Sequence, residues 1–141
     1  MAKHMFKSQD LKNIFETTPH NWEIHYVCDP PSFKDFRVDA HTHGLARTCG
    51  YEIQTTLAIP PEFGAYLLNT IGSLIARKIQ LEPGDYIYGL FEDDTMPVKL
   101  EENLDYQGES ILRILIPDKN RNFGPLAEYP YNTQSDSPYL E

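Results

Sequence analysis

Residues 61–80 carry an apolar stripe at helical spacing, and stretches with the alternation typical of β-strands lie on both sides of them. Pro60-Pro-Glu62 suits the start of a helix, because proline presets the first turn and an acidic side chain is favoured at its positive end. Gly72 inside the segment costs about 1 kcal/mol relative to alanine unless close packing requires it. The spacing predicts one helix that packs its stripe against a sheet. The stripe comprises Leu67, Leu68, Ile71, Leu74, Ile75 and Ile79.

The other periodic segments predict the sheet, because their side chains alternate or their apolar runs have the length of strands. These segments are residues 22–28, 37–45, 51–59, 86–91, 97–104 and 110–116. A connection of about five residues between the second and third segments favours an antiparallel pair. We therefore predict an α+β fold, with a five- to six-stranded antiparallel or mixed sheet and the main helix, at about 61–80, packed on one face.

The ends of the chain are predicted to be less regular than its middle. A short N-terminal helix is expected from Ser8, which can cap it. Residues 117–141 contain several prolines and no sustained period, which is typical of an irregular C-terminal tail. A length of 141 residues fits one domain over 1–141. The polar start leaves open that residues 1–5 include residues added ahead of a native Met5.

Composition limits the classes of partner. A net charge of −9 argues against nucleic acid, which is bound through clustered lysine and arginine. No apolar run has membrane-spanning length and no stretch is typical of a signal peptide, so no membrane partner is expected. Cys28 and Cys49 are too few for a disulfide framework, which predicts a cytoplasmic protein with reduced thiols. An unknown protein or small molecule remains as partner, and a homodimer stays open.

Chemistry concentrates in the segment from Arg37 to Leu45. If this segment is a strand, its polar side chains share one face because successive side chains alternate. That face would carry Arg37, Asp39, His41 and His43. We expect it to border a polar concavity, with residues 121–131 folded over it because their aromatic side chains need burial.

A metal site is one interpretation of this face. Asp39, His41 and His43 are ligand types that zinc or iron accepts, and histidines two residues apart in a strand can converge on one ion. Glu52, Cys49 or an acid from Glu92–Asp94 would complete the coordination. The metal-barrel folds with a similar histidine motif need more residues and later histidines than this chain has. The alternative is a polar strand face on which the histidines bond to protein groups.

Several short motifs resemble a bacterial family known as domain of unknown function forty-two sixty-two. They are Trp22 to Val27, His41-Thr-His-Gly-Leu45, Tyr51-Glu-Ile53, Ile59-Pro-Pro-Glu62, Leu67-Leu-Asn69, Pro83-Gly-Asp85 and Phe123-Gly-Pro125 with Tyr131. The resemblance spans about residues 22–131. It implies a small α+β domain without an established activity.

The residues thus point to a binding module more than to an enzyme. No nucleophile elbow, phosphate-binding glycine loop or dinucleotide fingerprint is present in the sequence. We predict an uncharacterised cytoplasmic module that binds a partner or small ligand, with no cofactor. The alternative is a metal-dependent hydrolase that holds a divalent metal on the Asp39, His41 and His43 face.

Overall fold

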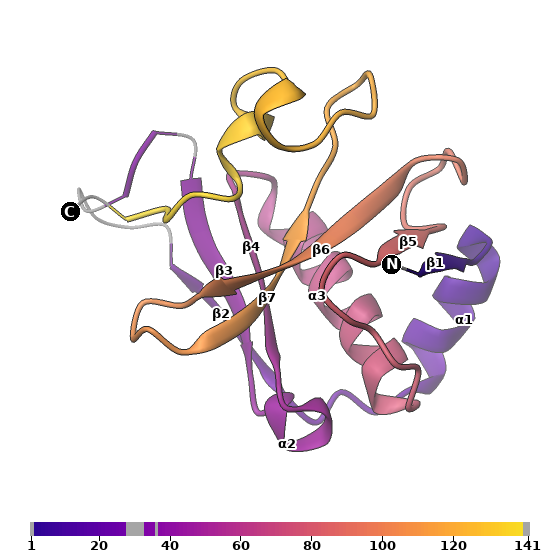
Figure 1. The fold of residues 1–141 in the computed structure, drawn as a ribbon. Coiled ribbons are helices and arrows are strands. Elements are labelled where there is room, and N and C mark those ends of the chain that lie inside the picture. Colours follow the sequence, from indigo (N-terminus) through magenta and orange to yellow (C-terminus); the bar gives the residue numbers. More distant parts are fainter. Residues whose placement is uncertain (1, 28–32, 36, 140–141) are drawn as a thin grey trace.

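A computed structural model describes residues 2–27, 33–35 and 37–139, and it forms one α+β domain with a seven-stranded sheet (Figure 1). The side chains of residues 48 and 49 are outside this description, as is the end of the strand predicted to reach residue 28. The strands are β1 Lys3–Met5, β2 Glu23–Val27, β3 Arg37–His43, β4 Glu52–Leu57, β5 Tyr86–Tyr88, β6 Pro97–Leu104 and β7 Ser110–Leu115. The helices are α1 Ser8–Thr17, α2 Ala46–Cys49 and α3 Pro61–Ala76.

The sheet is mixed and has the order β1-β5-β6-β7-β4-β3-β2. The β1–β5 and β4–β7 pairs are parallel, whereas the β2–β3, β3–β4, β5–β6 and β6–β7 pairs are antiparallel. The predicted fold class is confirmed, and so is the antiparallel pairing of the second and third segments, β3 and β4. The strand count exceeds the predicted five or six because Lys3–Met5 adds an edge strand. That segment is too short to show a period in the sequence.

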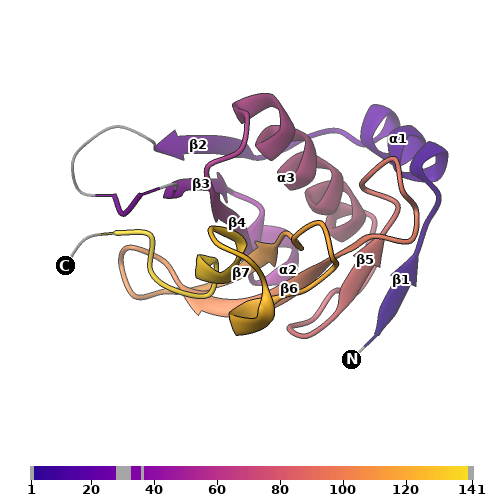
Figure 2. The same cartoon turned by 90° about the horizontal axis from the view of Figure 1, so that it is seen from above.

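Helices α1 and α3 lie together on one face of the sheet, as Figures 1 and 2 both show. The predicted stripe forms the core with the strands: Ile71 and Leu74 are fully buried, and Ile75 is 5% exposed. From β7, Leu112 and Ile114 belong to the same core. No helix in the described part of the chain is long and apolar enough to cross a membrane.

Gly72 is explained by a close contact with Trp22. A Cβ at position 72 would lie 2.8 Å from the Trp22 ring, which is closer than side chains approach one another. The ring is held there because its Nε1 donates a hydrogen bond to Asn69 Oδ1 at 2.9 Å. Close packing therefore requires glycine at this helical position.

Helix α3 ends at Ala76, four residues before the predicted end near Gln80. The Lys78 backbone is left-handed, with φ at 68°, which terminates the helix. The Lys78 N–H donates to Ile75 O and the Ile79 N–H to Leu74 O, which is a Schellman motif. The residue that reverses such a chain is usually glycine, so the sequence carried no stop signal here.

The tail after β7 is irregular, as predicted, but it is anchored to the sheet. Its regular parts are two 3-10 turns, Gly124–Leu126 and Tyr131–Thr133. The Gln134 side chain is 3% exposed and bonds to both the N–H and the carbonyl of Ile116. The chain thus returns from β7 across the sheet face opposite to the helices.

Candidate functional site

Strand β3 presents the predicted polar face. Its partner residues on β2 are Val27 for Asp39, His25 for His41 and Glu23 for His43. On the other face Ala40 and Thr42 are buried, with at most 1% exposure, as expected for the side under α3. The alternation therefore holds from residue 39 to residue 43.

Arg37 does not join the other candidates. The β3–β4 register shifts between Arg37 and Ala40, so the strand carries an extra residue there. Its Nε is buried and bonds to no group in the described part of the chain. Among the described residues that line the pocket beside His41, Arg37 is absent. The structure therefore does not bring Arg37 together with the other candidates, because a bulge interrupts the alternation.

Asp39 is the buried centre of the site, at 2% exposure. Its Oδ1 accepts hydrogen bonds from His41 Nδ1 at 2.8 Å and from Gln54 Nε2 at 2.9 Å. Its Oδ2 accepts a hydrogen bond from the Tyr139 hydroxyl. Burial acts to raise the pKa of Asp39, but these three donors outweigh it and the pKa is lowered. Asp39 is consequently a buried, ionised acceptor.

The bond to Asp39 defines the state of His41. An ionised carboxylate accepts the Nδ1 proton, so the other ring nitrogen, Nε2, is left for the pocket. This hydrogen bond raises the pKa of His41, and burial opposes it only in part. The charges of Asp105 and Glu52 act in the same direction. The surroundings of His41 therefore favour its protonated form.

A row of polar side chains extends the site across the sheet. Gln54 stands opposite His41 on β4, and Arg113 stands opposite Gln54 on β7. Arg113 is 1% exposed, and its Nε donates to Gln54 Oε1 at 2.9 Å. Its Nη1 donates to the carbonyls of Gln134 and Asp136. Burial lowers the pKa of Arg113, and the nearby acids oppose that effect.

Glu52 has a structural task. Its carboxylate accepts hydrogen bonds from the Thr42 hydroxyl and from the backbone N–H groups of Gly44, Leu45 and Ala46, at 2.8–3.1 Å. These bonds organise the turn from β3 into the short helix α2, where the sequence analysis expected only a short connection. Glu52 lines the pocket but its oxygens are engaged. The Cys49 side chain lies outside the described residues.

The histidine pocket, as we call the concavity beside His41, has a volume of about 430 Å³. His25 joins His41 and His43 there, with its ring centroid 5.3 Å from each of theirs. The β6–β7 loop closes the other side. The pocket is lined by His25, Val27, Asp39, His41, Thr42, His43, Glu52, Asp105, Tyr106, Gln107, Ile111 and Tyr139.

The cover over this pocket is not the predicted one. Tyr139 supplies it, and none of residues 121–131 lines the pocket. Phe123 packs instead against Tyr86, with ring centroids 6.0 Å apart. The prediction for 121–131 is wrong, because Phe123 packs over β5 and Tyr129 stays 57% exposed instead of covering the pocket. In the described part of the tail, residues 134–139 approach the site, through hydrogen bonds to Arg113 and Asp39.

Sequence reasoning missed His25, Gln54, Arg113 and Tyr139. The polar face of the 22–28 segment did contain His25, and antiparallel pairing with 37–45 would have brought it beside His41. Gln54, Arg113 and Tyr139 are distant in sequence, and no local pattern connects them.

Metal ligation finds little support in these positions. No three histidine, cysteine, aspartate or glutamate side chains among those the structure describes are close enough together to hold an ion. Asp39 and Glu52 direct their oxygens at protein donors, and His41 directs Nδ1 at Asp39. The metal interpretation remains an untested prediction.

Comparison with known proteins adds no relative. No family model matches the chain, and no match was found among curated proteins or solved structures. The resemblance to family forty-two sixty-two therefore stays a prediction. Geometry is the remaining guide to what the site does.

Proposed function

We propose that this chain is a small-ligand-binding module and that the ligand is a small monoanion held in the histidine pocket. The observation that carries the proposal is the fixed orientation of His41. Its Nδ1 faces a buried carboxylate, so the cationic form is favoured and Nε2 can donate to an anion. We also propose a cytoplasmic location, because two cysteines are too few for a disulfide framework.

The acidic residues around His41 favour a ligand that carries a single negative charge. Asp105 and Glu52 line the same pocket, and a multiply charged anion would be repelled by them. Tyr106 is 76% exposed beside them and offers an aromatic edge to the organic part of a ligand. A small carboxylate fits these properties best.

A metal-dependent hydrolase has less support. Both buried or half-buried carboxylates of the site are occupied by protein donors. Releasing either one for a metal would leave several hydrogen-bond donors unsatisfied, at about 1–3 kcal/mol each.

Carboxylate binding can be measured by following the histidine resonances in an NMR titration with acetate and lactate. We expect saturable shifts of His41 at pH 6 that weaken at pH 8.5, because the cationic imidazole is lost as pH rises. His41→Gln should abolish binding, whereas His20→Gln should not, since His20 packs against Phe15 and Trp22 outside the histidine pocket.

Two results would contradict the proposal. One is binding of equal strength at both pH values. The other is the absence of shifts at His41 up to saturating carboxylate. Stoichiometric zinc binding that shifts His41 and His43 together and raises the melting temperature would instead favour the hydrolase.

A further inference from the structure

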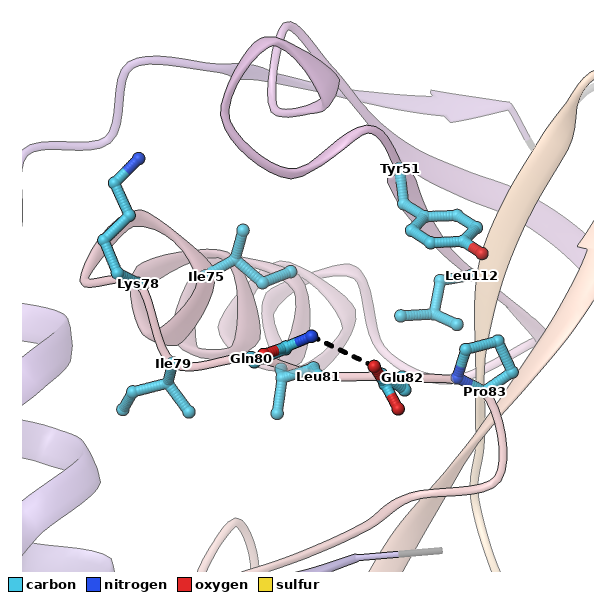
Figure 3. A pocket seen from close by; sticks show the side chains of 9 residues that line it. All are labelled: Tyr51, Ile75, Lys78, Ile79, Gln80, Leu81, Glu82, Pro83 and Leu112. Atoms are coloured by element: carbon cyan, nitrogen blue, oxygen red, sulfur yellow. Dashed lines mark hydrogen bonds between the residues drawn. The ribbon is translucent and has the colours of Figure 1, made fainter.

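A second pocket lies on the helix side of the sheet, beside the end of α3 (Figure 3). Its volume is about 510 Å³, which is within the range of small-molecule sites. Leu112 on β7 contributes to its floor, whereas the next residue, Arg113, points to the polar network on the opposite face. The two pockets are therefore separate, and a ligand in this one does not require the histidine pocket.

The lining of this pocket is apolar at its base and charged at its rim. Ile75 and Leu112 are buried, and Ile79 and Leu81 are half-buried, in a segment without regular structure. In Figure 3 the Lys78 amine stands at one side of the opening, and Tyr51 and Pro83 stand at the other. Glu82 also lines the rim, where its carboxylate accepts a hydrogen bond from the Gln80 amide.

Lys78 is an unexpected residue for its backbone conformation. It occupies the left-handed position of the Schellman motif, which favours glycine, and a lysine there is strained. The dipole of α3 does not require it, because Arg77 already places a cation at the helix end. Within the described part of the chain, the Lys78 amine makes no ion pair or hydrogen bond.

Among the residues that the structure describes, Arg121 is the other non-glycine residue with positive φ, and it provides a contrast. Its φ is 64°, and its guanidinium bonds to both Asp93 and Thr95 at 2.6 Å. The strain at Arg121 thus accompanies a contact inside the protein. Lys78 has the same backbone strain, but its amine has no such contact in the described part of the chain and lies at the rim of an apolar pocket.

We infer that this pocket, lined by Tyr51, Ile75, Lys78, Leu81, Pro83 and Leu112, binds an amphipathic monocarboxylate. The carboxylate pairs with the Lys78 amine, and the apolar body covers Ile75, Leu81 and Leu112. The Lys78 amine selects an anion at its own side of the rim, across the opening from the Glu82 carboxylate. The apolar floor selects a hydrocarbon body over a hydrated ion.

Octanoate and 1-octanol are suitable probes, because they share the hydrocarbon chain and differ in the charged group. Their affinities can be measured from the methyl resonances of Ile75, Ile79, Leu81 and Leu112. We expect the wild-type chain to bind octanoate about three- to fivefold more tightly than 1-octanol, the advantage of an exposed charge pair.

Lys78→Gly separates this role from a folding role. Because glycine accepts the left-handed backbone, the variant should melt at a higher temperature while its octanoate affinity falls to that of 1-octanol. Arg121→Gly is the matched control, and it should lose its contacts to Asp93 and Thr95 but keep octanoate binding. His41→Gln should also keep it, which distinguishes this site from the histidine pocket.

Three outcomes would overturn the inference. They are equal affinities of the wild-type chain for the two probes, unchanged octanoate affinity in Lys78→Gly, and a lower melting temperature of Lys78→Gly. The last would mean that Lys78 serves folding.

Discussion

The two faces of the sheet are held by different physics. Between α3 and the sheet the contacts are apolar and have no preferred direction. There Ile71, Leu74 and Leu100 are buried, and the removal of their apolar surface from water stabilises the fold. On the opposite face Asp39 and Arg113 are just as buried, but each depends on particular donors and acceptors. A core of the first kind tolerates apolar substitutions that conserve its volume. A network of the second kind does not, because each missing partner leaves a buried polar group unsatisfied.

The two faces also differ in where their contacting residues lie in the sequence. On the helix face, α3 contributes residues that repeat within one segment, whereas Gln54, Arg113 and Tyr139 of the polar face come from β4, β7 and the tail. The polar face therefore connects the end of the chain to the middle of the sheet.

The largest effect is expected for Arg113→Met. It would leave Gln54 Oε1 and the carbonyls of Gln134 and Asp136 without their donor, at a loss of about 3–5 kcal/mol in the free energy of unfolding. Urea denaturation measures this. Arg77→Met is the matched control, because Arg77 is exposed and its bonds to Thr17 and Thr18 should contribute about 1 kcal/mol or less. Equal losses in the two variants would remove the distinction between the faces.

Ile71→Ala tests the helix face. Ile71 belongs to α3 and is fully buried against the sheet. Its truncation should destabilise the fold by about 2–5 kcal/mol, through lost burial and a residual cavity. A loss below about 1 kcal/mol would show that the helix does not rest on the sheet through this side chain.

Gly72→Ala is expected to have an intermediate effect on the free energy of unfolding. It should destabilise the fold, although alanine has a higher helix propensity than glycine. Alanine favours the helix by about 1 kcal/mol, but its Cβ would meet the Trp22 ring at 2.8 Å, and such overpacking costs about 1–3 kcal/mol. We predict net destabilisation, measured by thermal unfolding. Adding Trp22→Leu should make Gly72→Ala neutral or stabilising, and failure of that rescue would count against the contact.

The contrast between the faces also explains what the sequence could predict. Periodicity located α3, the burial of Ile71 and Ile75, and the shared face of Asp39, His41 and His43, because those features repeat within a segment. The end of α3 before Lys78 was not predicted, because the left-handed position holds lysine and not the glycine that usually marks such an end. The bulge after Arg37, the engagement of Glu52 and the Tyr139 cover depend on neighbours from other segments, which a local pattern does not contain.

The smallest expected effect is a pH dependence of stability from His41. Its pKa is raised in the folded protein, so its contribution is complete below the unfolded pKa of about 6.5 and is lost as pH rises through the higher folded value. The stability of the wild-type chain relative to His41→Gln should therefore decline from pH 6 to pH 9. A difference that grows over this range would contradict the assignment. Asp39 acts at acidic pH, where its contribution is lost as pH falls through its lowered pKa.

The central claim is that buried Asp39 orients and charges His41, and the imidazole nitrogen resonances test it most directly. A pH titration by two-dimensional ¹H–¹⁵N NMR reports the tautomer and the pKa of each histidine. We predict that neutral His41 carries its proton on Nδ1 and titrates above 6.5, and that Asp39→Asn lowers its pKa. A His41 proton on Nε2, with a pKa that Asp39→Asn leaves unchanged, would contradict the account.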